Sequence, residues 1–180
     1  IVYHATATTQ QLHIDAFVDD AIELYPGIDR IENEWESLLG YLGEQDAIIV
    51  LDEFPYLIDA DGSLPSVIQR LWDQELQETG VTLVLVGSSI SMMEEATLLG
   101  NSPLYGRFTE RLDLRQLNFD AARQFFPEQY TPEQVLFAWG VFGGTPYYLA
   151  GIEADATLGT VIQQSLLSRQ GFLHDEPEYV

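Results

Sequence analysis

The sequence predicts an α/β fold in which a parallel β-sheet is followed by an all-helical segment. Two runs, residues 47–51 and 81–86, consist almost entirely of apolar residues that favour strands. Continuous runs of this kind are typical of parallel strands buried on both faces. Helical patterns separate the runs, and the pattern after Gln116 is helical throughout. We therefore predict two domains, an α/β core over residues 1–116 and a helical domain over residues 117–180.

Strands and helices alternate along the predicted core. Thr8 or Thr9 can cap a first helix, which Pro26-Gly27 ends, and Asp29 with Glu32 has the spacing of a capping box. Strands are expected at residues 1–5, 47–51, 81–86 and 111–114, and helices at residues 9–25, 29–42, 63–78 and 91–99. This alternation predicts a parallel sheet with helices on both of its faces.

Helix signals also mark the predicted second domain. Thr131 precedes Pro132 and is followed three residues later by Gln134, which is the pattern of a capping box with proline in the first turn. A break at Gly143-Gly144-Thr145-Pro146 follows this helix. Further helices are expected at residues 118–125, after the break, and at residues 157–168.

The charge balance of the chain is extreme. It has 180 residues, with 29 acidic residues against 7 basic ones, and a formal net charge of −22. A field of this sign repels nucleic acid phosphates and anionic membranes, so we expect no direct nucleic acid binding by this segment and no membrane association. Since 46% of the residues are hydrophobic, the chain can still bury a core. Such an acidic composition suits a salt-rich cytoplasm, as in haloarchaea, and we expect a cytoplasmic protein.

Other residue types limit the possible sites. The chain has no cysteine, and its three histidines, His4, His13 and His174, are too scattered to predict a metal site. We expect them to be at the surface or half-buried. The chain begins with Ile1 inside a strand pattern, which suggests a piece of a longer protein.

The strongest candidate site lies at the end of the run at residues 47–51, where Asp52 and Glu53 follow directly. Open α/β sheets bind their ligands at the carboxyl ends of the strands. A carboxylate pair at that point can hold Mg²⁺ and orient a water for attack on a phosphate. The alternative is a strand that simply ends in a polar turn, which Pro55 also fits.

Two further candidates come with simpler alternatives. Gly87-Ser88-Ser89 follows the next strand, and a hydroxyl there can sense a phosphate or position a water; a helix cap formed by Ser89 or Ser91 is the alternative. Arg107 precedes the last predicted strand, where a loop arginine can reach a neighbour's phosphate; an ion pair is the alternative, and Arg111 is a second candidate.

The sequence lacks the motifs of two common enzyme classes. No lysine is present, so a phosphate-binding loop of the Gly-x-x-x-x-Gly-Lys-Ser/Thr type does not occur within these residues. A Gly-x-Ser-x-Gly motif is also absent, so a serine hydrolase has no support.

Taken together, the motifs resemble those of the archaeal-type ATPases in the STAND branch of the AAA+ P-loop superfamily. The similar segments are Ile-Ile-Val-Leu-Asp-Glu-Phe-Pro-Tyr-Leu (48–57), Leu-Val-Leu-Val-Gly-Ser-Ser-Ile-Ser-Met-Met (83–93), Ser-Pro-Leu-Tyr-Gly-Arg (102–107) and Gly-Gly-Thr-Pro-Tyr-Tyr-Leu (143–149). The resemblance implies a three-layer P-loop NTPase core, here without its first strand, followed by a small all-helical lid.

The resemblance also implies roles for individual residues. Asp52 is similar to the Walker B aspartate that holds Mg²⁺ through water, and Glu53 to the general base. Ser88 falls at the first sensor position, and Arg107 falls where related ATPases place an arginine finger. Gly144 and Pro146 match the lid turn that packs near adenine and ribose. The implied cofactors are ATP and Mg²⁺.

The family's first strand and phosphate loop would precede Ile1. In its sheet order, 5-1-4-3-2, that strand lies between the fourth and the fifth. The resemblance therefore implies a switch ATPase when complete, with this chain alone inactive, whose nucleotide state moves the lid and controls an effector module or self-association. A non-catalytic scaffold that keeps the fold without nucleotide is the alternative. A third hypothesis is a Mg²⁺-dependent phosphohydrolase that uses Asp52 and Glu53 directly. The sequence lacks the additional carboxylates that such a site needs.

Overall fold

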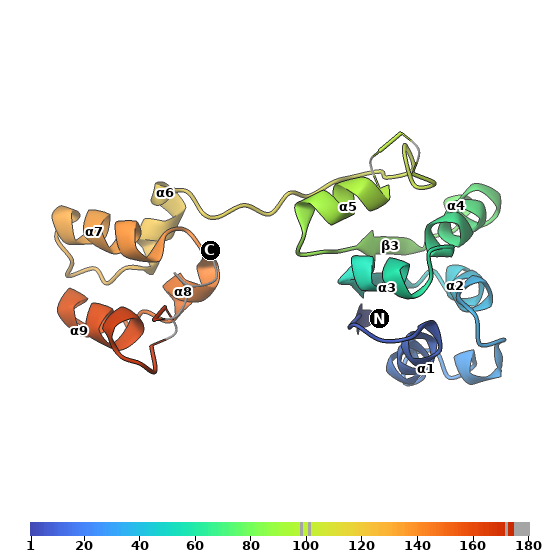
Figure 1. The fold of residues 1–180 in the computed structure, drawn as a ribbon, viewed down its shortest axis with the longest axis horizontal. Helices are drawn as coiled ribbons and strands as arrows, with labels where there is room; N and C mark the ends of the chain where they lie inside the picture. Colours follow the sequence, from blue (N-terminus) through green and yellow to red (C-terminus); the bar gives the residue numbers. More distant parts are fainter. Residues whose placement is uncertain (98, 101, 172, 175–180) are drawn as a thin grey trace. The chain divides into compact units, whose positions relative to one another are not determined.

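The structure, a computed structural model, describes residues 1–97, 99–100, 102–171 and 173–174. It divides into two compact units, Ile1–Arg111 (unit 1) and Leu112–Val180 (unit 2), each described by itself (Figure 1). The predicted domain boundary falls five residues later, between residues 116 and 117. Within the described residues, no helix has the length and apolar content that crossing a bilayer requires.

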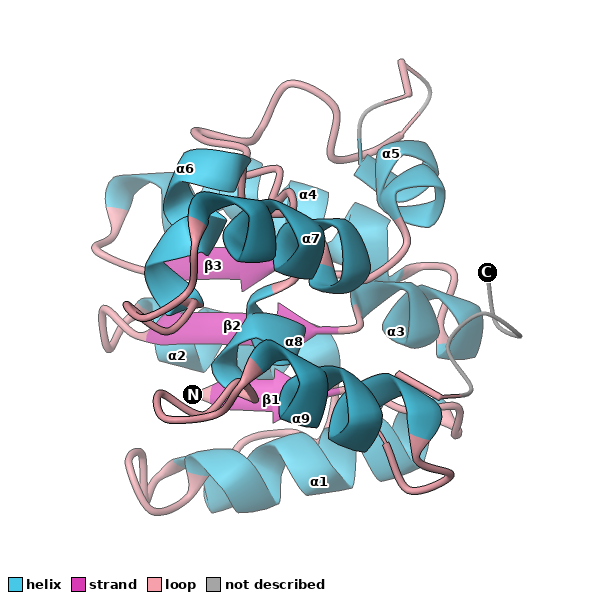
Figure 2. Cartoon of the chain, turned by 90° about the vertical axis from the view of Figure 1, so that its left-hand side faces the viewer, coloured by secondary structure: helices cyan, strands magenta, loops and turns pink. Residues whose placement is uncertain are grey.

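Unit 1 is a mixed α/β structure with a parallel three-stranded sheet, as the alternating pattern predicted. The strands are β1 (Val2–His4), β2 (Ile48–Asp52) and β3 (Thr82–Leu85). They lie side by side in sequence order, and Figure 2 shows the three arrows pointing the same way. The helices of unit 1 are α1 (Gln10–Ala21), η1 (Ile28–Arg30), α2 (Trp35–Gly43), α3 (Phe54–Ala60), α4 (Leu64–Gln74), η2 (Leu76–Glu78) and α5 (Ile90–Thr97).

The helices of unit 1 pack on one face of the sheet. Tyr3, Ile49 and Leu51 are buried in a cluster with Phe17 of α1 and residues of α2, α3 and α4. On the opposite face Val2 is 56% exposed and Ile48 is 61% exposed. The prediction of helices on both faces is therefore wrong for unit 1. The reason is topological: when strands follow one another in spatial order, right-handed crossovers place all connections on the same face.

Residues 111–114 do not form the predicted fourth strand. Leu112 and Leu114 are 82% and 83% exposed, so their side chains bury almost no apolar surface. A strand needs a neighbour to pair its backbone groups, and this segment pairs with none of the three strands of the sheet. A strand pattern in the sequence is therefore not sufficient by itself to form a strand.

All the regular elements among the described residues of unit 2 are helices. Its elements are α6 (Phe119–Ala122), η3 (Arg123–Phe125), α7 (Pro132–Phe142), α8 (Pro146–Ala150), α9 (Leu158–Ile162) and the π-helical turn η4 (Gln163–Leu167). The predicted capping box is confirmed, because Thr131 accepts from the backbone of Gln134 and the Gln134 side chain accepts from the backbone of Thr131. A separate apolar cluster that includes Ala138 and Leu149 forms its core.

One histidine lies in the core of unit 1, contrary to the expectation of surface or half-buried histidines. His13 of α1 is fully buried, and its Nδ1 atom lies 2.7 Å from the Tyr3 hydroxyl. Burial lowers the pKa of His13, because the charged imidazolium loses its hydration. Burial also raises the pKa of Tyr3, with a further contribution from the charge of Asp20. Both side chains therefore favour their neutral forms.

We expect His13 to make unit 1 less stable in mild acid. Because its pKa is lowered on folding, the unfolded chain binds a proton more readily as the pH falls below the ordinary histidine value of about 6.5. The contribution of His13 to the free energy of unfolding is therefore fully present above about pH 6.5 and decreases below it. Urea unfolding measures the free energy of unfolding at about pH 7.5 and about pH 5.5. Between these two pH values, His13→Gln should lose less of it than the parent chain does. The exposed control His174→Gln should lose as much as the parent, and equal losses in the parent and His13→Gln would contradict the assignment.

Candidate functional site

The carboxyl ends of the three strands meet at one edge of the sheet. Backbone hydrogen bonds fix them there: the amide of Ala5 donates to the Asp52 carbonyl at 2.9 Å, and the amide of Phe54 donates to the Val86 carbonyl at 2.9 Å. Side chains that follow β2 and β3 are therefore brought together without any long loop. This is the edge at which α/β sheets bind ligands.

Asp52 is the last residue of β2, and both of its carboxylate oxygens have partners. Oδ1 accepts the backbone N–H of Glu53 at 3.0 Å, and Oδ2 lies 2.7 Å from Nδ1 of His4. The side chain is 28% exposed, so a ligand can still reach it. These contacts orient the carboxylate at the edge of the sheet.

Glu53 adopts an unusual backbone conformation. Its φ of 53° and ψ of 44° lie in the left-handed region, which costs energy for a residue other than glycine. The turn allows α3 to begin at Phe54 directly after the strand, with Pro55 in the first turn, where its missing N–H is not needed. Strained residues of this kind cluster at functional sites.

Ser88 contacts Glu53 across the neighbouring strands. Its hydroxyl donates to Oε2 of Glu53 at 3.1 Å, and its backbone N–H lies 3.4 Å from the same oxygen. The neighbouring Ser89 instead accepts from the amide of Met92 near the start of α5, as the helix-cap alternative predicted for Ser89 or Ser91. The fold thus brings Asp52, Glu53 and Ser88 together at one edge.

The oxygen atoms of this cluster suit a magnesium ion. Mg²⁺ prefers carboxylate oxygen and water, and it usually takes one or two protein carboxylates and completes its shell with substrate phosphates. Asp52 and Glu53 supply such carboxylates on neighbouring residues, and Ser88 adds a hydroxyl. Among the described residues, no group of three or more histidine, aspartate or glutamate side chains is arranged to hold a metal.

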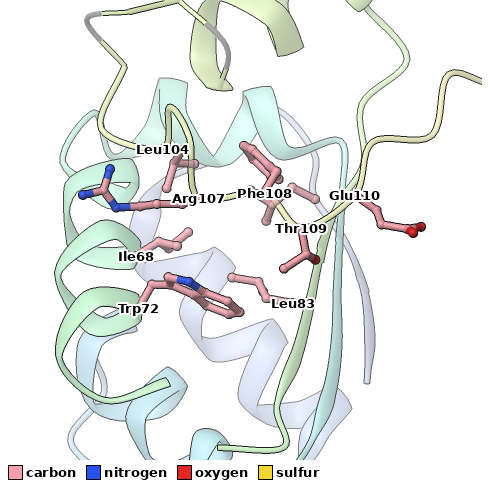
Figure 3. A pocket seen from close by; sticks show the side chains of 9 residues that line it. Ile68, Trp72, Leu83, Leu104, Arg107, Phe108, Thr109 and Glu110 are labelled. Atoms are coloured by element: carbon pink, nitrogen blue, oxygen red, sulfur yellow. The ribbon is translucent and has the colours of Figure 1, made fainter. Parts of the chain in front are cut away.

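Arg107 makes its contacts elsewhere in unit 1. Its guanidinium donates to both carboxylate oxygens of Asp73, at 2.8 Å and 2.6 Å, and to the carbonyls of Pro103 and Tyr105. It lines a pocket with Ile68 and Trp72 of α4 (Figure 3). The hydrogen bond and the positive charge of Arg107 lower the pKa of Asp73. Arg111 pairs with Glu94 at 2.9 Å. In this structure both arginines hold the segment before unit 2 against helices of unit 1.

Gly144 and Pro146 lie in unit 2. The Gly144 carbonyl accepts the N–H of Leu117 at 2.8 Å, and a side chain at Gly144 would overlap the Leu117 backbone. Pro146 opens α8, with Thr145 as its N-cap. The turn therefore joins α7, α8 and the segment that enters unit 2, and glycine is required by the close approach of the backbones.

Sequence reasoning missed one residue that contacts this cluster, His4. It is the last residue of β1 and lies directly opposite Asp52 in the sheet register. A signal was present, because His4 stands near the carboxyl end of a predicted strand, just as Asp52 does. Metal-ligand spacing along the chain does not reveal it, because the two residues meet only through the sheet.

The chain is similar to known proteins over most of its length. Residues 3–152 match the family described as an ATPase domain predominantly from Archaea. An uncharacterized protein of Methanocaldococcus jannaschii is 38% identical over 133 residues, which cover 74% of this chain and 30% of that protein. A second uncharacterized protein of the same organism is 39% identical over 46 residues, covering 26% of this chain and 45% of that protein.

The chain spans less than half of the length of these two relatives. No solved structure is significantly similar to it. The family match covers the strand-end cluster of unit 1 and continues through the Gly144 turn of unit 2. The chain therefore belongs to the family of ATPase domains found predominantly in Archaea.

Proposed function

We propose that this chain is the nucleotide-binding core and helical lid of a STAND-type switch ATPase. The observation that carries the proposal is the cluster of Asp52, Glu53 and Ser88 at the carboxyl edge of the sheet. Membership in the ATPase family supports nucleotide as the ligand. Nucleotide binding and hydrolysis would move unit 2 and control an effector module.

Each residue of the cluster has a role in this proposal. Asp52 would hold hydrated Mg²⁺, and that ion would supply positive charge to offset the negative charge of the phosphates. Glu53 accepts a proton from the attacking water. The hydrogen bond from Ser88 holds the Glu53 carboxylate at the carboxyl edge of the sheet. The water must lie within hydrogen-bond reach of Glu53, roughly 2.6–3.2 Å, for the proton to be transferred.

We also propose roles for the other predicted residues, Arg107, Gly144 and Pro146. Arg107 would act as a finger on a neighbouring subunit's phosphate only after it leaves Asp73, to which it is bound by two hydrogen bonds. Gly144 and Pro146 shape the turn that in this proposal contacts adenine and ribose. The triphosphate needs further ligands, because this chain has no lysine and no phosphate-binding loop of the usual type.

We expect Mg²⁺–ATP to bind to the full gene product and not to the 180-residue chain alone. Calorimetric titration at molar KCl, a condition that suits a net charge of −22, measures both. Binding by the full gene product supports the proposal. Binding by both would also support it and would show that these residues suffice. No binding by either would overturn the proposal and favour a scaffold that keeps the fold without nucleotide.

A further inference from the structure

His4 occupies a defined place beside the candidate metal ligand. The register of the sheet sets it directly opposite Asp52, and the Ala5 amide donates to the Asp52 carbonyl at 2.9 Å. Nδ1 of His4 lies 2.7 Å from Oδ2 of Asp52. An ionised carboxylate can only accept hydrogen bonds, so Nδ1 carries the hydrogen and donates it.

This hydrogen bond completes the restraint of the Asp52 carboxylate. The backbone N–H of Glu53 holds Oδ1, and His4 holds Oδ2, so rotation of the carboxylate would break one bond or the other. Both donors belong to backbone-fixed positions, one in the turn after β2 and one at the end of β1. The remaining lone pairs of the carboxylate are then confined to fixed directions.

We infer that His4 is a positioning residue that orients Asp52 toward the hydrated Mg²⁺ ion. The inference rests on the proposed function, since it assigns a role in the same site. Groups that hydrogen-bond a metal ligand fix its direction, and their loss typically weakens metal binding about 10–100-fold. The His4 side chain is 70% exposed, so its loss removes little packing. Its effect should therefore appear in metal binding and not in folding.

The test compares nucleotide affinity with and without Mg²⁺ in the full gene product. In His4→Leu, we expect the gain in ATP affinity on adding Mg²⁺ to fall at least about tenfold. Affinity in EDTA and the midpoint of thermal unfolding should stay at the parent's values. His4→Asn should restore the gain, because the asparagine amide nitrogen takes nearly the place of Nδ1 and donates the same hydrogen bond.

A matched control removes another exposed hydrogen bond to an aspartate of unit 1. Gln10 donates to Oδ2 of Asp61 at 2.6 Å, and Gln10→Ala should leave the Mg²⁺ effect unchanged. An unchanged or larger Mg²⁺ effect in His4→Leu, in a parent that binds Mg²⁺–ATP, would overturn the inference alone. A parent that binds no nucleotide in either condition would overturn the proposed function, and the inference with it.

Discussion

Replacing Glu53 with glutamine in the full gene product should lower the rate of ATP hydrolysis about 10²–10⁴-fold and leave Mg²⁺–ATP bound. Glutamine has nearly the shape of glutamate and keeps an oxygen that can accept from Ser88, so the 3.1 Å contact can persist. It cannot accept a proton from water at neutral pH. The loss should therefore appear in the chemical step, as a lower kcat with an affinity near that of the parent.

Phosphate release and calorimetry measure the two quantities. Glu44→Gln is a suitable control, because it changes the net charge by the same amount at an exposed position after α2. The control should hydrolyse ATP at the parent's rate. Normal turnover by Glu53→Gln would remove Glu53 from the mechanism.

Replacing Phe17 with alanine should lower the free energy of unfolding of unit 1 by about 3–5 kcal/mol. Phe17 is fully buried, and its ring makes edge-to-face contacts with Tyr3 at 5.8 Å and Trp35 at 5.2 Å between centroids. These contacts join α1, α2 and β1. The cavity left by alanine would weaken the support of β1, whose last residue is His4.

Urea unfolding, followed by near-ultraviolet circular dichroism at constant KCl, measures this loss. Leu12→Ala on the same helix is the control, because Leu12 is 57% exposed and its truncation should change stability by less than about 0.5 kcal/mol. A loss below about 1 kcal/mol in Phe17→Ala would contradict the packing described for α1.

The sequence was sufficient to predict the parallel sheet, because the runs that became β2 and β3 are almost entirely apolar. It was also sufficient to predict the capping box of α7, since Thr131 and Gln134 act through bonds over three residues. The proximity of Asp52, Glu53 and Ser88 follows from the same rule, because carboxyl ends of parallel strands share one edge.

The rest depends on contacts between distant parts of the chain. No helix was predicted at α3, because Pro55 fits a polar turn as well as it fits the first turn of a helix. The role of Arg107 could not be decided, because its partner Asp73 lies 34 residues away. The position of His4 opposite Asp52 likewise depends on the register of two strands.

The parallel pairing of the strands also affects how the chain folds. Every parallel pairing joins distant residues, as in the hydrogen bond between Ile1 and the Ile48 carbonyl, 47 residues apart. In unit 2, most of the backbone bonds lie within one helix or turn. Non-local pairings require closure of long loops and form slowly, whereas local contacts form fast. Unit 2 should therefore be structured while unit 1 is still searching for its register, and the edge that carries Asp52 is completed only when all three strands have met.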